Sequence, residues 1–299
     1  MSLLVVGSVA YDSVESPKGK VDKALGGSAV FFSAAASLFT RVNAVGVVGD
    51  DYKIADLDFL KDRGVGLDGV KQVPGETFSW GGVYGKDWND RETLFTKLGV
   101  FADFKPEIPE QYRKSDYVFL ANIAPDLQMD VLAQVDSPKL VVLDTMNFWI
   151  EGQLDSLLKV IEKTDLLIIN DQEIKQLTGI NDIFRASEKV FTMGPKYLVV
   201  KKGEHGAVLI SKTDKFFAAI YPVDEVIDPT GAGDSFAGGF MGYLAREDNL
   251  EWETMKKAVI YGTAAASFTV EDFSINRLKS ATMDEVDKRV DSIRKMTNF

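Results

Sequence analysis

Short apolar runs alternate along this chain with amphipathic or alanine-rich segments, and the alternation predicts strands and helices in turn. The predicted strands are residues 3–6, 43–48, 117–120, 140–143, 166–169 and 197–201, followed by a hairpin at 207–211 and 215–219. The predicted helices are residues 27–39, 54–63, 151–162, 171–177, 185–191, 234–246 and 252–268, then a last one with the apolar stripe Met283, Val286, Val290 and Ile293. This order predicts an α/β fold, with a Rossmann-like, mostly parallel sheet sandwiched by helices.

One segment breaks the strand–helix alternation. Residues 77–84 and 91–97 are strand-like, and only the polar turn 85–90 joins them. We therefore expect a single domain over residues 1–299 with a small β-sheet inserted at about residues 72–98. Its apolar residues have to be buried against the active site, as a lid carrying Trp80 and Tyr84, or against a partner subunit in a homodimer. An edge hairpin without a role is the alternative.

The composition is that of an ordinary globular protein, with 45% hydrophobic and 26% charged residues. The net charge of −11 argues against a nucleic-acid-binding surface, which needs a basic patch. The absence of cysteine excludes disulfides and thiolate zinc sites, and the single histidine, His205, is expected to be solvated. Neither a signal-peptide pattern nor a long uncharged apolar stretch is present, so we expect a cytoplasmic protein without membrane contact.

Residues 228–240, Asp-Pro-Thr-Gly-Ala-Gly-Asp-Ser-Phe-Ala-Gly-Gly-Phe, are the most informative stretch. Backbone N–H groups at a glycine-rich helix start are unpaired and attract anions, so Gly231, Ala232 and Gly233 predict an anion hole. Asp234 adds a negative charge beside that hole. Accepting a proton from a hydroxyl that attacks phosphorus gives such a charge a purpose. The alternative is an N-cap with a tight turn, where Asp is also common.

Two segments near the N-terminus are candidates for substrate contact. Gly26 and Gly27 precede an alanine-rich helix and permit close approach of the backbone to a ligand, although a plain loop has the same pattern. Asp12 comes just after the first strand, where its carboxylate can accept hydrogen bonds from two neighbouring sugar hydroxyls. The alternative for Asp12 is a turn residue.

Two further segments are candidates for nucleotide and metal contact. Asn170 and Glu173 follow a predicted strand and lie on one face of the first helical turn, where Glu173 can hold Mg²⁺ through water. The alternative is that Asn170 and Glu173 only cap a helix with an acidic first turn. Gly203 and Gly206 let the chain turn beside a nucleotide, and Lys201 and Lys202 can meet phosphates, whereas an exposed turn is the alternative.

Other nucleotide-binding motifs are excluded. The segment 64–69 matches Gly-x-Gly-x-x-Gly, but it ends a predicted helix and leads toward strand-like residues, which is the reverse of the dinucleotide-binding order. A helix C-terminal stop explains it. The Gly-x-x-x-x-Gly-Lys-[Ser/Thr] motif of Walker-type kinases is absent.

The stretch 228–240 resembles the C-terminal signature of the ribokinase-like sugar and nucleoside kinases, the PfkB carbohydrate kinases. The glycine pair at 26–27 and the Asn-x-x-Glu at 170–173 are similar to two less specific motifs of that family, and the resemblance runs from Leu3 to about Phe268. It implies a ribokinase-like fold with a β-sheet lid, ATP and Mg²⁺, Asp234 as the catalytic base, and residues 231–233 as the anion hole.

The resemblance also assigns the remaining candidates. The assignments are Asp12, Gly26 and Gly27 to the acceptor; Asn170 and Glu173 to Mg²⁺ and phosphate; Lys202, Gly203, Gly206 and Thr230 to ATP; Gly262, otherwise explained by close helix packing, to the adenine pocket; and Asp228 to a monovalent cation such as K⁺. Asp144 and Asn147 resemble a family segment with altered spacing, which places them outside direct ligand contact.

One departure bears on the substrate. Family members usually carry Asn five residues after the first glycine of the pair, and this chain has Phe31. A phenyl ring cannot hydrogen-bond a hydroxyl but can stack on a base, which favours a nucleoside over a simple sugar. We therefore predict an ATP-dependent kinase that phosphorylates a primary hydroxyl of a sugar or a ribonucleoside. The alternative from another class is a non-catalytic nucleotide-binding regulator of the same fold.

Overall fold

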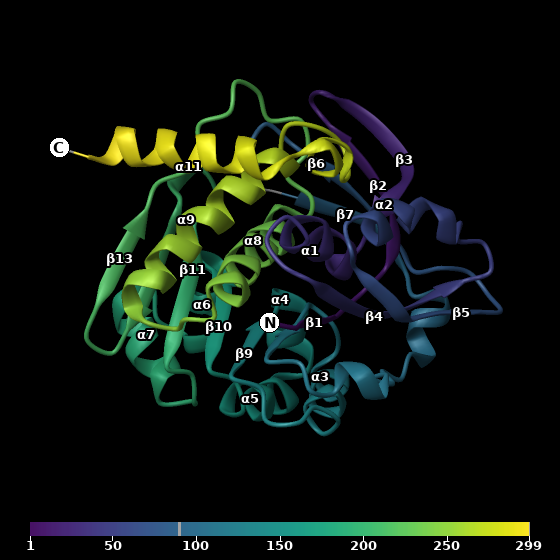
Figure 1. Ribbon diagram of the computed structural model, residues 1–299, viewed down its shortest axis with the longest axis horizontal. Coiled ribbons are helices and arrows are strands. Elements are labelled where there is room, and N and C mark those ends of the chain that lie inside the picture. The colour runs from purple at the N-terminus through teal and green to yellow at the C-terminus, as the bar shows by residue number, and fades with distance from the viewer. Residues whose placement is uncertain (89–90, 299) are drawn as a thin grey trace.

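The computed structural model describes residues 1–88 and 91–298 (Figure 1). Its centre is a nine-stranded sheet that is parallel from β11 to β5 and antiparallel at the β11–β12–β13 edge. The strands in spatial order are β13 (Lys215–Ala218), β12 (Ala207–Ser211), β11 (Tyr197–Lys201), β10 (Leu166–Asn170), β9 (Leu140–Asp144), β8 (Tyr117–Leu120), β1 (Leu3–Val6), β4 (Val42–Gly49) and β5 (Gly66–Val73). The predicted α/β class is therefore confirmed.

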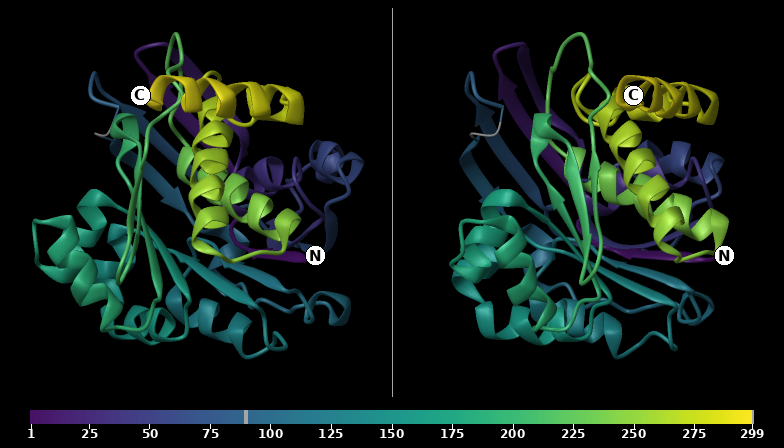
Figure 2. Two further views of the ribbon diagram at one scale, coloured as in Figure 1. Left: turned by 60° about the vertical axis from the view of Figure 1, so that its left-hand side comes forward. Right: turned by 90° about the vertical axis from the view of Figure 1, so that its left-hand side faces the viewer.

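Helices cover both faces of this sheet (Figure 2). Successive strand side chains point to opposite faces, so Leu3 and Val5 enter one core while Leu4 and Val6 enter the other. On the first face lie α1 (Ser28–Ala36), α2 (Asp58–Asp62), α8 (Ala232–Glu247), α9 (Trp252–Thr269), α10 (Asn276–Ser280) and α11 (Met283–Thr297). On the second lie α3 (Pro125–Leu132), α4 (Asn147–Gly152), α5 (Leu154–Glu162), α6 (Asp171–Thr178) and α7 (Ile183–Phe191).

The small sheet has four strands where the sequence predicted two. In spatial order they are β3 (Gly19–Gly26), β2 (Ala10–Ser16), β6 (Ser79–Tyr84) and β7 (Arg91–Lys97). Strand β3 was missed because it is charged and mostly exposed, without an alternating pattern; it is a strand because β2 pairs with it. The last two residues of the predicted turn 85–90, Asn89 and Asp90, lie outside the described residues.

Several predicted helices differ at their boundaries. The predicted helix 151–162 is two helices, α4 and α5, separated at Gln153, whose φ of −141° is not helical. The predicted helix 54–63 begins with a 3₁₀ turn at Ile54–Leu57 before α2. The other 3₁₀ turns are Gly99–Asp103, Glu110–Tyr112 and Gly203–His205. Among the described helices, none combines the length and apolar character that crossing a bilayer requires.

Helices α1 and α8 approach each other closely because α8 presents glycine at the contact. A Cβ on Gly238 would lie 2.4 Å from the Phe32 carbonyl oxygen and 2.9 Å from the Ala35 Cβ. Both atoms belong to the buried helix α1, so they cannot move aside as the end of a flexible side chain can. The same two helices meet again at the start of α8, where a Cβ on Gly231 would lie 2.3 Å from the Phe31 ring of α1.

We predict that Gly238→Ala destabilises the protein although alanine favours helices. Alanine in an unhindered helix interior gains about 1 kcal/mol over glycine, but overpacking a core typically costs about 1–3 kcal/mol. The measurement is the free energy of unfolding in urea. Gly152→Ala is the control, since no heavy atom lies within 4 Å of a Cβ there. A Gly238→Ala protein as stable as the control would contradict the close-contact argument.

Candidate active site

Helix α8 begins at a left-handed turn, since its N-cap residue Gly231 has a φ of +76°. A Cβ at Gly231 would lie 2.3 Å from the buried Phe31 ring, so glycine alone fits here. The Ala232 N–H donates to the Pro229 carbonyl at 3.1 Å. Within the part of the chain that the structure describes, the N–H groups of Gly231 and Gly233 have no acceptor. Two of the three amides of the expected anion hole are thus available at the positive end of a long helix.

Asp234 lies in the first turn of α8 and is partly exposed. Desolvation and the negative charge of Asp144 raise the pKa of Asp234 to about 7, against the opposing influence of Lys201. A carboxylate with a pKa near neutrality is suited to accept a proton from a substrate and release it afterwards.

Lys201, the last residue of β11, is the cation of this region. Its Nζ lies 3.1 Å from Oδ1 of Asp144, and both side chains are largely buried. Desolvation lowers the pKa of Lys201, but Asp144, Glu173 and Asp234 together outweigh it and raise the pKa above its ordinary value. A Cβ on Gly233 would lie 3.0 Å from Lys201 Nζ, so the ammonium adjoins the free amides.

Asn170 and Glu173 form a capping box at the start of α6. Asn170 Oδ1 accepts the N–H groups of Gln172 and Glu173 at 2.9 and 2.8 Å, and the Asn170 N–H donates to Glu173 Oε2 at 2.9 Å. Desolvation raises the pKa of Glu173 to about 7, and Lys201 opposes this shift. The helix cap considered from the sequence is therefore present, and its carboxylate also belongs to the charge cluster around Lys201. The Mg²⁺ role of Glu173 stays a prediction.

Asp12, in β2, forms the other side of the site and is only 8% exposed. A Cβ on Gly26 would lie 2.0 Å from Asp12 Oδ2, so glycine leaves the room that this carboxylate occupies. Desolvation and the nearby charge of Asp228 raise the pKa of Asp12 to about 7, while the Gly27 N–H and Arg91 lower it.

The small sheet contacts the turn that precedes α8. The Tyr84 hydroxyl, at the end of β6, lies 3.1 Å from Thr230 Oγ1, and the Trp88 ring lies against the Tyr84 ring. Asp228 is nearly buried and accepts the N–H groups of Thr230 at 2.9 Å and Ser274 at 3.4 Å. The carboxylate of Asp228 therefore holds this turn, and a cation beside it stays a prediction.

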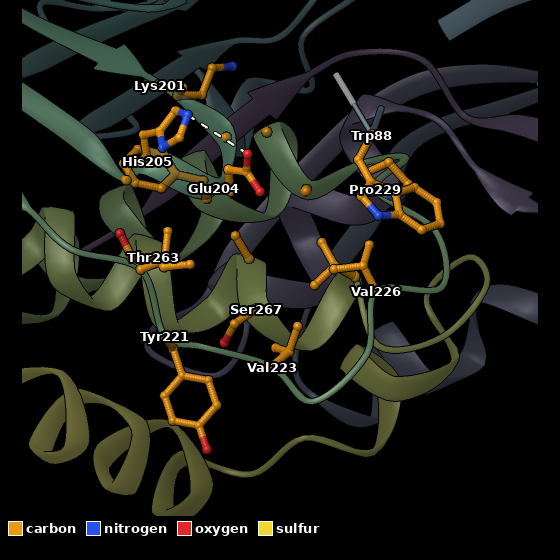
Figure 3. Close-up of a pocket in the computed structure, with 18 of the residues that line it drawn as sticks. Trp88, Lys201, Glu204, His205, Tyr221, Val223, Val226, Pro229, Thr263 and Ser267 are labelled. Atoms are coloured by element: carbon orange, nitrogen blue, oxygen red, sulfur yellow. Dashed lines mark ion pairs between the residues drawn. The ribbon is translucent and has the colours of Figure 1, made fainter. Parts of the chain in front are cut away.

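A pocket of about 620 Å³ opens beside the start of α8 (Figure 3). Its walls are the β11–β12 turn with Lys201 and His205, helix α9 with Thr263 and Ser267, and the segment 220–229. His205 is exposed and lies 3.8 Å from Glu204. The end near Lys201 carries the charge and the free amide of Gly233, while the opposite end, with Tyr221 and Val223, is largely apolar.

The pocket contains some of the residues proposed for ATP contact. Gly203 and Gly206 line it, whereas Asn170, Lys202, Thr230 and Gly262 are not among its lining residues, and neither is Asp234. A Cβ on Gly262 would lie 2.8 Å from a carbonyl oxygen of α8, which is the close helix packing considered as the alternative. Thr263, the next residue of α9, lines the pocket instead.

Three charged residues of the site were not assigned to it from sequence. Lys202, and not Lys201, was assigned to ATP. The alternation of side chains along β11 does favour Lys201, because Val199 faces the core under α8 and Lys201 lies on the same face two residues later. Asp144 follows Val142 on β9 in the same way. Arg91, at the start of β7, has no comparable signal in the sequence. It comes near Asp12 only because β7 pairs with β6 and β6 pairs with β2.

The family model described as pfkB family carbohydrate kinase matches residues 2–280. The chain therefore belongs to this family, and the predicted resemblance is confirmed. Members of the family are sugar and nucleoside kinases, and the protein is a kinase of that class.

Curated relatives agree with this assignment, and solved structures share the fold. A cytidine kinase of Thermococcus kodakarensis is 28% identical over 258 residues, 84% of this chain and 91% of that protein. A nucleoside kinase of Methanocaldococcus jannaschii is 26% identical over 246 residues, 80% of this chain and 78% of that protein. A crystal structure of M. jannaschii nucleoside kinase superimposes with a TM-score of 0.76 at 23% identity, and the match covers 97% of this chain and 98% of the chain in that structure. A putative ribokinase II of E. coli, solved with ATP and Mg²⁺, has a TM-score of 0.77 at 19% identity, with coverage of 97% and 99%.

We predict that Asp12→Asn stabilises the protein relative to wild type at pH 8 but not at pH 4. The wild-type carboxyl has a pKa of about 7 when folded and about 4 when unfolded, so its contribution to stability is present below pH 4 and is lost as the pH rises through 7. Asparagine does not ionise, so the variant should gain about 1–4 kcal/mol over wild type at pH 8. Urea unfolding at both pH values tests this. Asp136→Asn, at an exposed carboxylate, is the control, and a gain independent of pH would refute the prediction.

Proposed function

We propose that this kinase transfers the γ-phosphoryl group of ATP to a primary hydroxyl of a ribonucleoside, with a sugar as the second acceptor class. The observation that carries the proposal is that Lys201 and Gly233 line one end of the pocket, while the adjoining Asp234 shares its charge environment with Lys201. A base beside an anion site is what phosphoryl transfer to an alcohol needs.

Asp234 acts as the base. In its ionised form it accepts the proton of the attacking hydroxyl, and the active fraction grows as the pH rises through about 7. The positive charge of Lys201 keeps part of the cluster ionised despite its burial. The Gly231 and Gly233 amides, the α8 dipole and the Lys201 ammonium stabilise negative charge that develops on the transferred group.

The residues present fit a metal–nucleotide complex. Bound Mg²⁺ neutralises phosphate charge, and it commonly takes one or two carboxylates together with water and phosphate oxygens. Glu173 and Asp144 are the carboxylates that adjoin Lys201 and would hold it. Residues 1–88 and 91–298 contain no group of three or more acidic or histidine side chains that forms a cage by itself.

Asp12 and the glycine pair 26–27 bind the acceptor in this proposal. The Asp12 carboxylate accepts hydrogen bonds from ribose hydroxyls, and the small sheet, through Tyr84, closes the site against water. Phe31 is 2% exposed and packs beneath Gly231. Stacking of its ring on a nucleoside base therefore requires the ring to move, and it stays a prediction. The relatives named cytidine kinase and nucleoside kinase support a nucleoside acceptor.

The proposal has two finer features, a monovalent cation and a dimer. K⁺ beside Asp228 and a homodimer through the small sheet are both retained as proposals. The dimer is supported by β7 lying at the edge of that sheet with Leu94 exposed, because an edge strand offers unpaired backbone groups to a second chain.

We predict that Asp234→Asn lowers kcat by about 10²–10⁴-fold, the usual contribution of a general base. The amide cannot accept the proton, but it keeps the shape of the side chain, so ATP affinity should change little. Acceptor-dependent ADP release measures kcat, and titration with a fluorescent ATP analogue measures affinity. Asp136→Asn is again the control, and near-normal turnover of Asp234→Asn would rule out the assigned base.

We also predict that nucleosides, and among them pyrimidine nucleosides, support faster ADP release than free ribose or hexoses. The expected difference in kcat/KM is about 10-fold or more, corresponding to about 1.4 kcal/mol of extra binding by the base. A panel of nucleosides and sugars at equal concentration, each with an acceptor-free control for ATP hydrolysis, measures it. Preference for a hexose would assign the protein to the sugar kinases of the family.

A further inference from the structure

Arg289 is a buried arginine of the C-terminal helix α11, which lies beyond residues 2–280 that match the family. Its guanidinium carbon lies 3.5 Å from the centre of the Phe268 ring and 4.6 Å from that of Tyr221. Nη1 donates to Ser267 Oγ at 2.7 Å, and Nη2 donates to both carboxylate oxygens of Glu271 at 2.9 and 2.7 Å. The charge is thus paired, hydrogen-bonded and stacked, as a buried guanidinium requires.

Two of these partners, Tyr221 and Ser267, also line the pocket. Lys201 and Tyr221 lie at opposite ends of the side chains labelled in Figure 3. Because phosphates belong at the charged end with Lys201 and the amides, the apolar end with Tyr221 and Val223 is the place for the nucleotide base.

The wall at Tyr221 packs against the core but lacks backbone support. Among the described residues, the segment 221–226 makes no backbone–backbone hydrogen bond, and its recorded ion pair joins Glu225 to Lys18. The Tyr221 hydroxyl points away from the other labelled side chains (Figure 3). Stacking of its ring against Arg289 therefore attaches this irregular segment to α11.

Ser267 is held by the same guanidinium. Its hydroxyl donates to the Ala264 carbonyl at 2.6 Å and accepts from Arg289, so both its proton and a lone pair are committed. Loss of Arg289 would leave a polar atom without this partner at the apolar end of the pocket.

We propose that Arg289 is a positioning residue for the phosphate donor, holding Tyr221 and Ser267 so that the base end of the pocket keeps its shape. It touches no reacting atom and acts through these two side chains. The inference rests on the proposed function in one respect, namely that this pocket receives the nucleotide.

Arg289→Met tests the proposal, because methionine keeps an apolar chain but removes the charge and the planar donors. The expected result is a rise in the KM for ATP on the order of 10-fold, with kcat and the acceptor KM within about 2-fold of wild type, since only uniform donor binding is lost. Arg289→Lys should show an intermediate KM, because an ammonium cannot stack and bond as a guanidinium does.

Arg277→Met is the matched control. Arg277 also lies over Phe268, at 4.7 Å, and pairs with Glu271 and Glu285, but its recorded contacts include no pocket residue. It should lower the thermal unfolding temperature as Arg289→Met does while leaving the KM for ATP unchanged. An equal KM shift in both variants, or none in Arg289→Met, would overturn the proposal.

Two further measurements keep the test decisive. Tyr221→Leu removes only the stacked ring and should raise the KM for ATP similarly even where Arg289→Met folds poorly; an unchanged KM would count against the inference. The dissociation constant of a fluorescent ATP analogue is measured for every variant. If wild type binds the analogue but shows no acceptor-dependent ADP release, the proposed function fails, and the ratio of dissociation constants between Arg289→Met and Arg277→Met still decides the role of Arg289.

Discussion

The Lys201 ammonium compensates the repulsion between acidic side chains gathered at the carboxyl edge of the large sheet. Asp144, Glu173 and Asp234 all act on it, and each carboxyl has a raised pKa because it is withdrawn from water. Bringing these acids together without a cation would cost more than the surrounding hydrogen bonds return. The position of Lys201 therefore limits how Asp144, Glu173 and Asp234 can be arranged beside the start of α8.

The parallel sheet makes this arrangement possible. Strands β9, β10 and β11 are neighbours that end at the same edge, so Asp144, Asn170 and Lys201 come together although they are far apart along the chain. Open α/β sheets bind ligands at this edge for the same reason. Helix α8 then points its N-terminus at the edge, and its contact with α1 brings in the glycine pair and Asp12.

Two peripheral parts of the chain complete the site. The small sheet reaches the turn before α8 through the Tyr84–Thr230 contact, next to the Gly231 and Gly233 amides. On the opposite side, α11 supports the far wall of the pocket through Arg289. The surroundings of Thr230 and of Tyr221 thus depend on elements outside the large sheet, whereas the charge cluster around Lys201 belongs to the sheet edge and α8.

The sequence by itself determined the alternation of strands and helices, the class of fold, and the family, because hydrophobic periodicity and the residues 228–240 are local signals. It did not reveal β3, whose charged residues form a strand only by pairing with β2. Nor could it choose Lys201 over Lys202 or bring Arg91 and Arg289 to the site. Those outcomes depend on contacts between residues distant in the chain, and only the packed structure decides which side chains share a buried volume.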